Sequence, residues 1–549
     1  MTRVALILSG GASLGSYVGG AATEILRALM GNRSRERVTL DVVTGASAGA
    51  LTAGLVARAV TVNVHLLPWI ERAWVDGADA AALLNPDRSD RSGWFDASAV
   101  EQLADALIAA DPASDDEPSE TLGEPLRLAL TLSNLRGVRY DFRYGFLNVP
   151  DRFYGTRLYA DWIEFELRRE NRAGDPVWEE IREAALASGS FPFAFPPRRL
   201  RRRIADYPGA RLPEAAEDGT VEMWYADGGL FDNTPLGLAK RLVERSPDHR
   251  EADWRYIMVE PSLRSASGED DGGAGITGSP AQLAGLLASA VLGQGAAKDW
   301  IRANKVNVRL EILQAIVERI PEMNQRLGDP EAVVLGRRIG ELAERVAEMK
   351  VTVRRAPTAS GPGDPVLEYL DENQRRIEKD PRYASVLSRE ESRVGRARLA
   401  KFIFVLEAAC GLRDKERMAL YLVAPAESGQ LSGDFMGNFG GFFNREWRAN
   451  DFRAGRRDAR RLIEQHLGDV IDYEPEEAAA YEVVELEPSF DSIPPESRRQ
   501  LEALIEREAD RLLAEIRPGA LASLFGWAWK PVIRGWAKDR IVAALREMA

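Results

Sequence analysis

The segment DVVTGASAGAL (Asp41–Leu51) joins an apolar run to a turn of small residues and then to a helix-compatible stretch. Its centre reads Gly-x-Ser-x-Gly, with Ser47 between Gly45 and Gly49. A serine on a sharp strand-to-helix turn presents its hydroxyl clear of the backbone, and the flanking glycines allow the tight turn and the close approach of a substrate. The pattern predicts Ser47 as a nucleophile; a tightly packed turn without chemistry is the alternative.

The chain before this turn alternates between strand and helix patterns. A strand is predicted over Val4–Leu8, then a glycine-containing loop over Ser9–Gly15, a helix over Ser16–Met30 and a second strand over Leu40–Thr44. Continuous apolar runs are typical of strands buried on both faces of a parallel sheet. The order therefore predicts an α/β fold with both faces of the sheet covered, and such sheets bind ligands beyond the carboxyl ends of their strands.

Composition limits the possible classes of protein. A chain of 549 residues predicts roughly two to four domains. The net charge of −13 argues against a nucleic-acid partner. The single cysteine, Cys410, cannot form an internal disulfide, and with only three histidines a zinc site of the usual ligands is not expected. No stretch approaches ~20 uninterrupted apolar residues, so we expect no membrane-spanning helix and a cytoplasmic protein.

The loop LSGGASLG (Leu8–Gly15) is the second glycine-rich turn between a strand and a helix. Its backbone amides favour an anion at the helix N-terminus. Gly10, Gly11 and Gly15 do not form the Gly-x-Gly-x-x-Gly pattern of a dinucleotide-binding turn. The other interpretation, which we favour, is an oxyanion hole, because adjacent parallel strands bring this loop beside Ser47. Each donor in such a site stabilises the transition state by ~3 kcal/mol.

A serine nucleophile also needs a group that accepts its proton. Asp227 follows a short predicted strand and precedes Gly228 and Gly229, which leave its carboxylate open. A carboxylate in hydrogen-bond reach of a serine accepts the proton directly if burial raises its pKa. A plain turn is the alternative for Asp-Gly-Gly. A triad of Ser47, Asp227 and His249 is also possible in chain order, although His249 lies in a charged loop.

Three segments, taken in order, resemble the patatin-like phospholipase family. They are GGASLG (Gly10–Gly15) after the first strand, GASAG (Gly45–Gly49) after the second, and ADGGLFDNTPL (Ala226–Leu236) further along. The segment ASGSFPFAFPP (Ala187–Pro197) also resembles the family's stretch ahead of the Asp-Gly-Gly motif. The set is specific, whereas each piece alone is not.

The resemblance implies a serine–aspartate acyl hydrolase on a three-layer α/β/α domain. It implies lipid or phospholipid acyl esters as substrates and no metal or cofactor. On the matching positions, Ser47 is the nucleophile and Asp227 is the base. The first loop, Gly10, Gly11 and Ala12, supplies the oxyanion hole through the amides of Gly11 and Ala12.

The first loop departs from the family pattern, which usually reads Gly-Gly-Gly-x-Arg/Lys-Gly. Ala12 stands in place of the third glycine, and Leu14 in place of the basic residue. Backbone donors survive these changes, but the lost cation affects head-group preference or the rigidity of the loop. The departure also motivates an alternative function, a membrane-associated binding or scaffold protein with a catalytically weak hydrolase domain.

The predicted organisation has three segments. A hydrolase domain covers 1–275, a helical connecting region covers 276–355, and a mostly helical C-terminal domain covers 366–549. Within the last, DFMGNFGGFFNREWRANDFRAGRRDA (Asp434–Ala459) resembles a domain of unknown function found in bacterial patatin-related proteins. Its phenylalanines and tryptophan predict an aromatic packing cluster, with a lipid-facing lid as the alternative.

Two basic segments leave alternatives open. PPRRLRRRI (Pro197–Ile204) carries five arginines and predicts a solvated turn or a contact with an anionic head group. Gly519–Ala549 has apolar residues, several tryptophans among them, at helical spacing between basic residues. This pattern predicts an amphipathic helix that either lies in a membrane interface, as a peripheral contact, or docks on the protein's own core.

Overall fold

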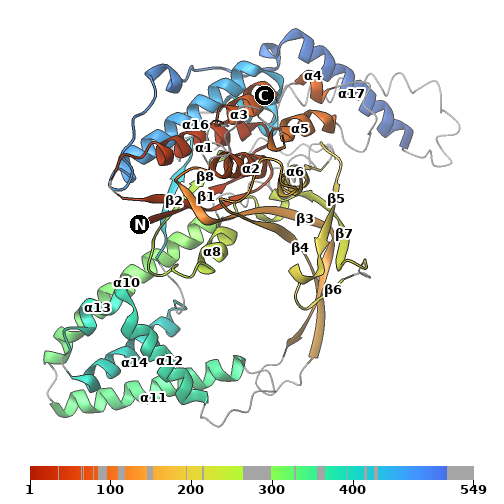
Figure 1. The fold of residues 1–549 in the computed structure, drawn as a ribbon. Helices are drawn as coiled ribbons and strands as arrows, with labels where there is room; N and C mark the ends of the chain where they lie inside the picture. The colour runs from red at the N-terminus through yellow and green to blue at the C-terminus, as the bar shows by residue number, and fades with distance from the viewer. Residues whose placement is uncertain are drawn as a thin grey trace, which may run out of the picture. The chain divides into compact units, whose positions relative to one another are not determined.

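The computed structural model describes the chain as two compact units, and Figure 1 traces the chain through its helices and strands. Unit 1 comprises Met1–Asp299 and Ala419–Ala549, and unit 2 comprises Trp300–Met418. This division differs from the three predicted segments, because residues from 419 onward return to unit 1. The residues that the structure describes are 1–34, 36–62, 65, 67–77, 80–84, 95–108, 118–144, 152–192, 194–212, 216–263, 298–326, 329–354, 365–390, 392–412, 417–425 and 431–515.

The centre of unit 1 is a parallel sheet built from the predicted apolar runs. β1 (Thr2–Leu8) pairs with β2 (Val38–Gly45) on one side and with β8 (Asp253–Val259) on the other. β2 also pairs with the first part of β3 (Leu122–Tyr144), and β8 pairs with β9 (Ala419–Val423). The side chains of β1 and β2 are almost all buried, as expected for strands covered on both faces. β9 thus brings the chain back to this sheet after unit 2.

The other end of the sheet is antiparallel. β4 (Arg152–Leu167) pairs along one side of β3, and β7 (Thr220–Asp227) pairs with β3 on the side that β2 also uses. β5 (Arg198–Arg203) pairs with β7, and β6 (Ala210–Arg211) pairs with β3. The strand order is β5-β7-β3-β2-β1-β8-β9, with β4 and β6 attached to β3.

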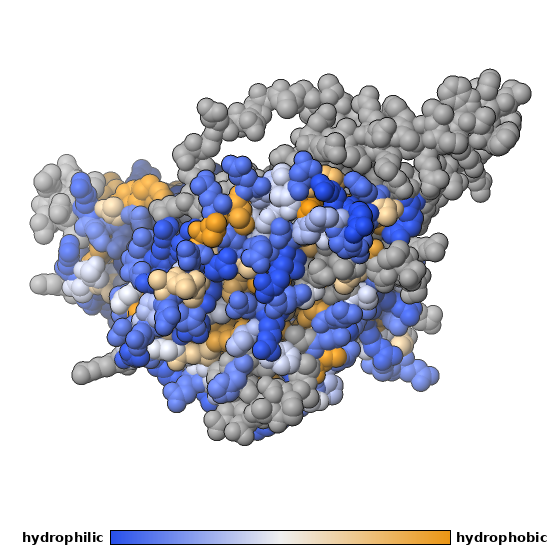
Figure 2. All heavy atoms as spheres, turned by 90° about the horizontal axis from the view of Figure 1, so that it is seen from above, coloured by the Kyte–Doolittle hydropathy of each residue, from blue (hydrophilic) through white to orange (hydrophobic). Residues whose placement is uncertain are grey.

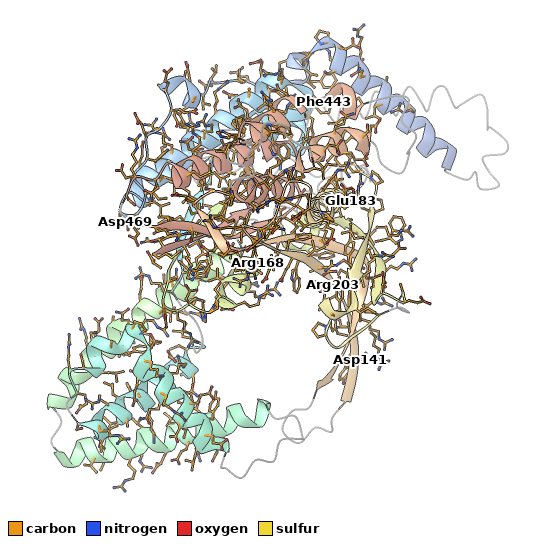
Figure 3. All side chains as sticks on the ribbon, in the orientation of Figure 1. Asp141, Arg168, Glu183, Arg203, Phe443 and Asp469 are labelled. Atoms are coloured by element: carbon orange, nitrogen blue, oxygen red, sulfur yellow. The ribbon has the colours of Figure 1, made fainter. Side chains whose placement is uncertain are left out.

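The arginine-rich stretch forms β5 and is not the solvated turn that its composition predicts. Alternate side chains of a strand face opposite sides, so Arg202 points into the protein, where it is 3% exposed and lies 3.7 Å from Asp161. Arg198 lies 3.6 Å from Glu183, which is labelled in Figure 3. Pairing with β7 and two ion pairs, one of them to the buried Asp161, therefore account for two of the five arginines.

Helices cover both faces of the sheet. α1 (Gly15–Met30), α2 (Ala48–Thr61) and α16 (Arg445–His466) lie on one side, and α8 (Leu236–Glu244) lies on the other (Figure 1). α6 (Val177–Ser188) packs against α2. The predicted three-layer α/β/α architecture is confirmed.

α1 and α16 lie side by side at very short distance. A Cβ atom at Gly455 would lie 2.1 Å from the carbonyl oxygen of Tyr17. Arg456 and Glu24, which are both buried, form an ion pair at 2.8 Å between Nη2 and Oε2. The region that resembles a domain of unknown function therefore packs directly on the first helix of the chain.

In the view of Figure 2 the described surface is mainly hydrophilic, with small separate hydrophobic patches.

Further helices of unit 1 are mostly short. They are η1 (Ala12–Leu14), α3 (Leu67–Glu71), the π-helix η3 (Arg72–Gly77), α4 (Ala80–Leu83), α5 (Ala97–Ala104), η4 (Asp105–Leu107), η5 (Ile204–Asp206), α7 (Gly229–Asp232), η6 (Ser432–Asp434), α15 (Phe435–Asn438), η7 (Gly440–Phe443), η8 (Ala478–Tyr481), η9 (Phe490–Ser492) and α17 (Pro495–Glu515).

Unit 2 is helical and has a hydrophobic core of its own. Val317, Ile377 and Ile403 are fully buried in this core. The unit confirms the expected helical character of the chain after the hydrolase domain. Its helices are α10 (Lys298–Arg326), α11 (Asp329–Arg354), α12 (Pro365–Lys379), α13 (Pro381–Leu387) and α14 (Arg393–Ala409).

The basic amphipathic segment Gly519–Ala549 lies outside the described residues, so its predicted helix stays a prediction. Among the helices that the structure does describe, none combines the length and the apolar character needed to cross a membrane.

Candidate active site

Ser47 occupies the sharp turn between β2 and α2. β2 ends at Gly45, and α2 begins at Ala48, so Ser47 lies at the helix N-terminus. Its backbone has φ 51° and ψ −124°, a conformation that non-glycine residues rarely adopt and that clusters at functional sites. The turn also requires a close approach of β1, because a Cβ atom at Gly49 would lie 2.2 Å from the carbonyl oxygen of Leu8.

Asp227 meets Ser47 because two strands end head to head. β2 and β7 pair with the same side of β3 but run in opposite directions along it. The last residue of β2, Gly45, lies opposite Leu130, and the last residue of β7, Asp227, lies opposite Leu132. Ser47 Oγ donates a hydrogen bond of 2.6 Å to Asp227 Oδ2. The structure thus brings the two predicted catalytic residues together.

The Asp227 carboxylate is fully buried, and its environment changes its acidity. Burial raises the pKa of Asp227 to about 7, although the hydrogen bonds from Ser47 Oγ and Gly229 N act in the opposite direction. Ser133 Oγ donates to the backbone carbonyl of Asp227 at 2.6 Å and fixes the end of β7. The site therefore holds a carboxylate that exchanges its proton near neutral pH.

Ser188, at the end of α6, is a site residue that the sequence did not single out. Its hydroxyl oxygen accepts a hydrogen bond of 2.9 Å from the backbone N–H of Ser47. Its carbonyl oxygen accepts from Gly228 N at 3.1 Å, and the carbonyl of Ser190 accepts from Asp227 N at 2.9 Å. The segment Ser188–Ser190 thus holds both Ser47 and Asp227 in place. The only signal for it was the resemblance of Ala187–Pro197 to the family.

The first glycine loop lies against Ser47. A Cβ atom at Gly10 would lie 2.9 Å from Ser47 Cβ, so only a glycine allows this approach. The amide of Gly10 donates to the carbonyl oxygen of Asn233 at 3.2 Å, which removes Gly10 from the predicted oxyanion donors. Among the described residues, no protein acceptor contacts the amides of Gly11 and Ala12. These two amides remain as candidate donors.

Glu260 is a second buried carboxyl group near this loop, and no sequence pattern pointed to it. It follows β8 and is 0% exposed. Its oxygens accept hydrogen bonds from Thr234 Oγ1 at 2.9 Å and from Ser262 Oγ at 2.8 Å, and burial raises its pKa. Because Thr234 follows Asn233, Glu260 helps to fix the segment that binds Gly10.

His249 lies at the opposite edge of the sheet from Ser47. It precedes β8, whose first residue pairs with Thr2 at the start of β1, whereas Ser47 lies beyond the end of β2 near Leu8. The length of β1 separates these edges by about 20 Å. The Nδ1 atom of His249 is 3.0 Å from the carbonyl oxygen of Ser246. The structure therefore contradicts the alternative triad of Ser47, Asp227 and His249.

A cluster of phenylalanine rings adjoins the segment that holds Ser47 and Asp227. Phe191 packs on Phe439 with ring centroids 5.5 Å apart, and Phe439 packs on Phe95 and Phe442. Phe95 in turn packs on Phe195. All of these except Phe442 are only partly buried. The predicted aromatic cluster of the C-terminal segment thus extends to the candidate active site.

The arrangement can transfer a proton between a hydroxyl and a carboxylate and can bind negative charge on two amides. Within the described parts of the chain, no group of three or more His, Cys, Asp and Glu side chains is placed to hold a metal ion.

Comparison with known families assigns two regions. Residues 6–240 match the family described as patatin-like phospholipase. Residues 420–479 match a family described as protein of unknown function (DUF3376). The first region contains Ser47 and Asp227, and the second contains all of α16 and all of β9 except its first residue.

Two curated proteins are similar to parts of the chain. The uncharacterized protein y4iI of Sinorhizobium fredii is 24% identical over 351 residues, which cover 47% of this chain and 49% of the relative. The uncharacterized membrane protein Rv3479 of Mycobacterium tuberculosis is 28% identical over 239 residues, which cover 41% of this chain and 21% of the relative. The chain thus spans about half the length of the first relative and a fifth of the second.

Proposed function

We propose that this chain, which carries a patatin-like phospholipase domain, hydrolyses lipid acyl esters with Ser47 as nucleophile and Asp227 as base. The family supports a lipid acyl hydrolase in general. The observation that carries the finer proposal is the hydrogen bond of 2.6 Å from Ser47 Oγ to a buried Asp227.

In the first step, Ser47 Oγ attacks the ester carbonyl carbon while Asp227 accepts the hydroxyl proton. Negative charge develops on the carbonyl oxygen, where the amides of Gly11 and Ala12 stabilise it. The tetrahedral intermediate then collapses, the alcohol leaves with the proton from Asp227, and the acyl group stays on Ser47. In the second step, water attacks this ester, Asp227 accepts the water proton, and the fatty acid leaves as Ser47 regains its hydrogen.

The aromatic cluster supports a substrate with an apolar acyl chain. Phe191 directly follows Ser190, whose carbonyl binds the amide of Asp227, so partly buried rings begin beside the reacting atoms. Such rings offer large apolar area to an acyl chain. Peripheral contact of Gly519–Ala549 with a membrane surface would give access to lipids; this segment has the basic amphipathic pattern that such contact requires.

The proposal predicts which molecules disappear from a lipid mixture. Wild-type protein is incubated with a bacterial lipid extract beside Ser47→Ala protein, and both reactions are followed by mass spectrometry. We expect acyl esters to decline and free fatty acids to accumulate with the wild type alone. Equal lipid profiles in both reactions, with no labelling of Ser47 by a fluorophosphonate probe, would instead support a binding or scaffold protein.

The pH dependence of the reaction reports on the base. Because the pKa of Asp227 is raised to about 7, its carboxyl group stays protonated at lower pH. A protonated carboxyl group cannot accept the proton of Ser47. We expect kcat/KM for a soluble p-nitrophenyl ester to rise about tenfold per pH unit below the midpoint and to level off above it. Initial rates at constant ionic strength locate the midpoint. A midpoint near the ordinary aspartate value of about 4 would contradict the assignment of Asp227.

A further inference from the structure

Three non-glycine residues in the described part of the chain have a positive φ angle. They are Ala12 at 48°, Ser47 at 51° and Asn438 at 72°. Such conformations cost of order 1–3 kcal/mol and persist only where the surrounding structure holds them. Ala12 and Ser47 belong to the proposed oxyanion loop and nucleophile turn. Asn438 belongs to the region matched by the domain of unknown function, far away in the sequence.

Ser13 connects the loop of Ala12 to the segment of Asn438. Its hydroxyl is buried, donates a hydrogen bond of 2.7 Å to the carbonyl oxygen of Asn438 and accepts one of 3.0 Å from the amide of Gly441. The carbonyl oxygen of Gly433 lies 3.4 Å away. All of these partners are backbone atoms of the C-terminal segment. The residue next to Ala12 is therefore held by a region more than four hundred positions further along the chain, as the separation of 425 between Ser13 and Asn438 shows.

The contact is too close for larger residues on the C-terminal side. A Cβ atom at Gly441 would lie 2.7 Å from Ser13 Oγ, and one at Gly433 would lie 2.9 Å from Leu14 Cδ2. Leu14 is 0% exposed. The position where the family usually has a basic residue is thus covered by the C-terminal segment, and a cation there would be buried at a high free-energy cost. An uncharged leucine at position 14 is therefore consistent with burial under the C-terminal segment.

The C-terminal segment is itself fixed by buried charged side chains of α16. Asp451 accepts hydrogen bonds of 2.8 Å from the amides of Ser432 and Gly433. Arg448 donates to the carbonyl oxygens of Gly441 at 2.9 Å and Phe442 at 3.1 Å. Figure 3 labels the next residue, Phe443, on the same side of the sheet as α16. Both ends of the segment that contacts Ser13 are therefore anchored.

From these contacts we infer that residues 431–451 act as a clamp that holds the oxyanion loop in its reactive geometry through Ser13. The region of unknown function is then a positioning element of the active site. Ser13 touches no reacting atom and acts through the amides of Gly11 and Ala12. Those amides stabilise negative charge only if they are held in place before the reaction. The inference rests on the proposed function.

The test is Ser13→Ala, which deletes the hydroxyl and keeps the loop sequence otherwise intact. We expect kcat for a p-nitrophenyl ester to fall about 10- to 100-fold per active site, with KM and the pH midpoint unchanged. Active sites are counted with a fluorophosphonate, so a loss of folded protein does not enter the result. Thr23→Val is the matched control, because Thr23 lies in α1 and its hydroxyl, among the residues that the structure describes, bonds within that helix, at 2.8 Å to the carbonyl of Gly19.

A second variant approaches the clamp from the other chain segment. Gly441→Ala is expected to lower kcat in the same way, and less so when combined with Ser13→Ala, because both changes act on one contact. Unchanged kcat in either folded single variant overturns the clamp, and so does failure of both variants to fold, which would make the contact a folding determinant. An inactive wild type would instead refute the proposed function itself.

Discussion

Replacing Ser47 by alanine is expected to lower the turnover of a p-nitrophenyl acyl ester by about four orders of magnitude or more. Without the hydroxyl no acyl-enzyme forms, and only charge stabilisation by the loop amides is left. The turn itself should survive, since its bond to Ser188 uses the backbone amide of residue 47. Initial rates and labelling by a fluorophosphonate measure both effects, and labelling should vanish.

A matched control separates this chemistry from the loss of a buried hydroxyl. Ser246 is also buried, but its hydroxyl accepts a hydrogen bond of 2.8 Å from Arg127 and it lies near His249, at the opposite edge of the sheet. Ser246→Ala should retain activity and labelling. If Ser47→Ala kept full turnover with its fold intact, the nucleophile would have to be sought elsewhere.

Replacing Asp227 by asparagine is expected to lower kcat about a thousandfold or more, because asparagine cannot accept the proton of Ser47. The same change should alter stability in a pH-dependent way. The pKa of Asp227 is raised from 3.8 to about 7 by burial in the folded protein. Between these values the unfolded chain releases its proton while the folded chain keeps it, so the wild type loses stability as pH rises.

The difference in melting temperature between Asp227→Asn and wild type therefore has a defined course. It should be smallest near pH 4, grow in favour of the variant towards about pH 7, and stay constant above that. Thermal unfolding across this range measures it. A constant difference would mean that Asp227 is ionised in the folded protein throughout, which removes the physical basis for its role as base.

His249→Ala is the companion to this variant. Because His249 lies at the far edge of the sheet, its replacement should leave kcat and the pH profile unchanged. A His249→Ala protein that is folded but fully inactive would support the triad of Ser47, Asp227 and His249 and contradict this interpretation of the geometry.

Much of the site was predictable because its chemistry follows local rules. An apolar run before Gly-x-Ser-x-Gly predicts a strand, a sharp turn and a helix, and the structure has β2, Ser47 and α2 in that order. The glycine loop after β1 was predictable for the same reason. Asp227 was identified by its residue type, the glycines after it and the resemblance to a family.

Other features depend on partners that are distant in the sequence. The composition of Pro197–Ile204 predicts a solvated turn or a contact with an anionic head group, but pairing with β7 makes Arg198–Arg203 a strand. Gly10 was predicted as an oxyanion donor, but its amide donates a hydrogen bond to the carbonyl oxygen of Asn233. β9 follows a separate helical unit and still joins the sheet of the first domain, so no local pattern revealed that division of the chain.

Local sequence patterns were enough to predict the strand-turn-helix around Ser47, the glycine loop, and an aspartate that follows a strand and precedes two glycines. Hydrophobic periodicity and turn preferences depend on residues that are close together in the chain, and they can therefore be recognised in the sequence. The burial of Asp227 against Ser47 depends on tertiary packing, because the ends of β2 and β7 meet on β3. The hydrogen bonds that Asn438 and Gly441 make to Ser13 also depend on tertiary packing, because they require two backbone segments that are distant in the sequence to lie together.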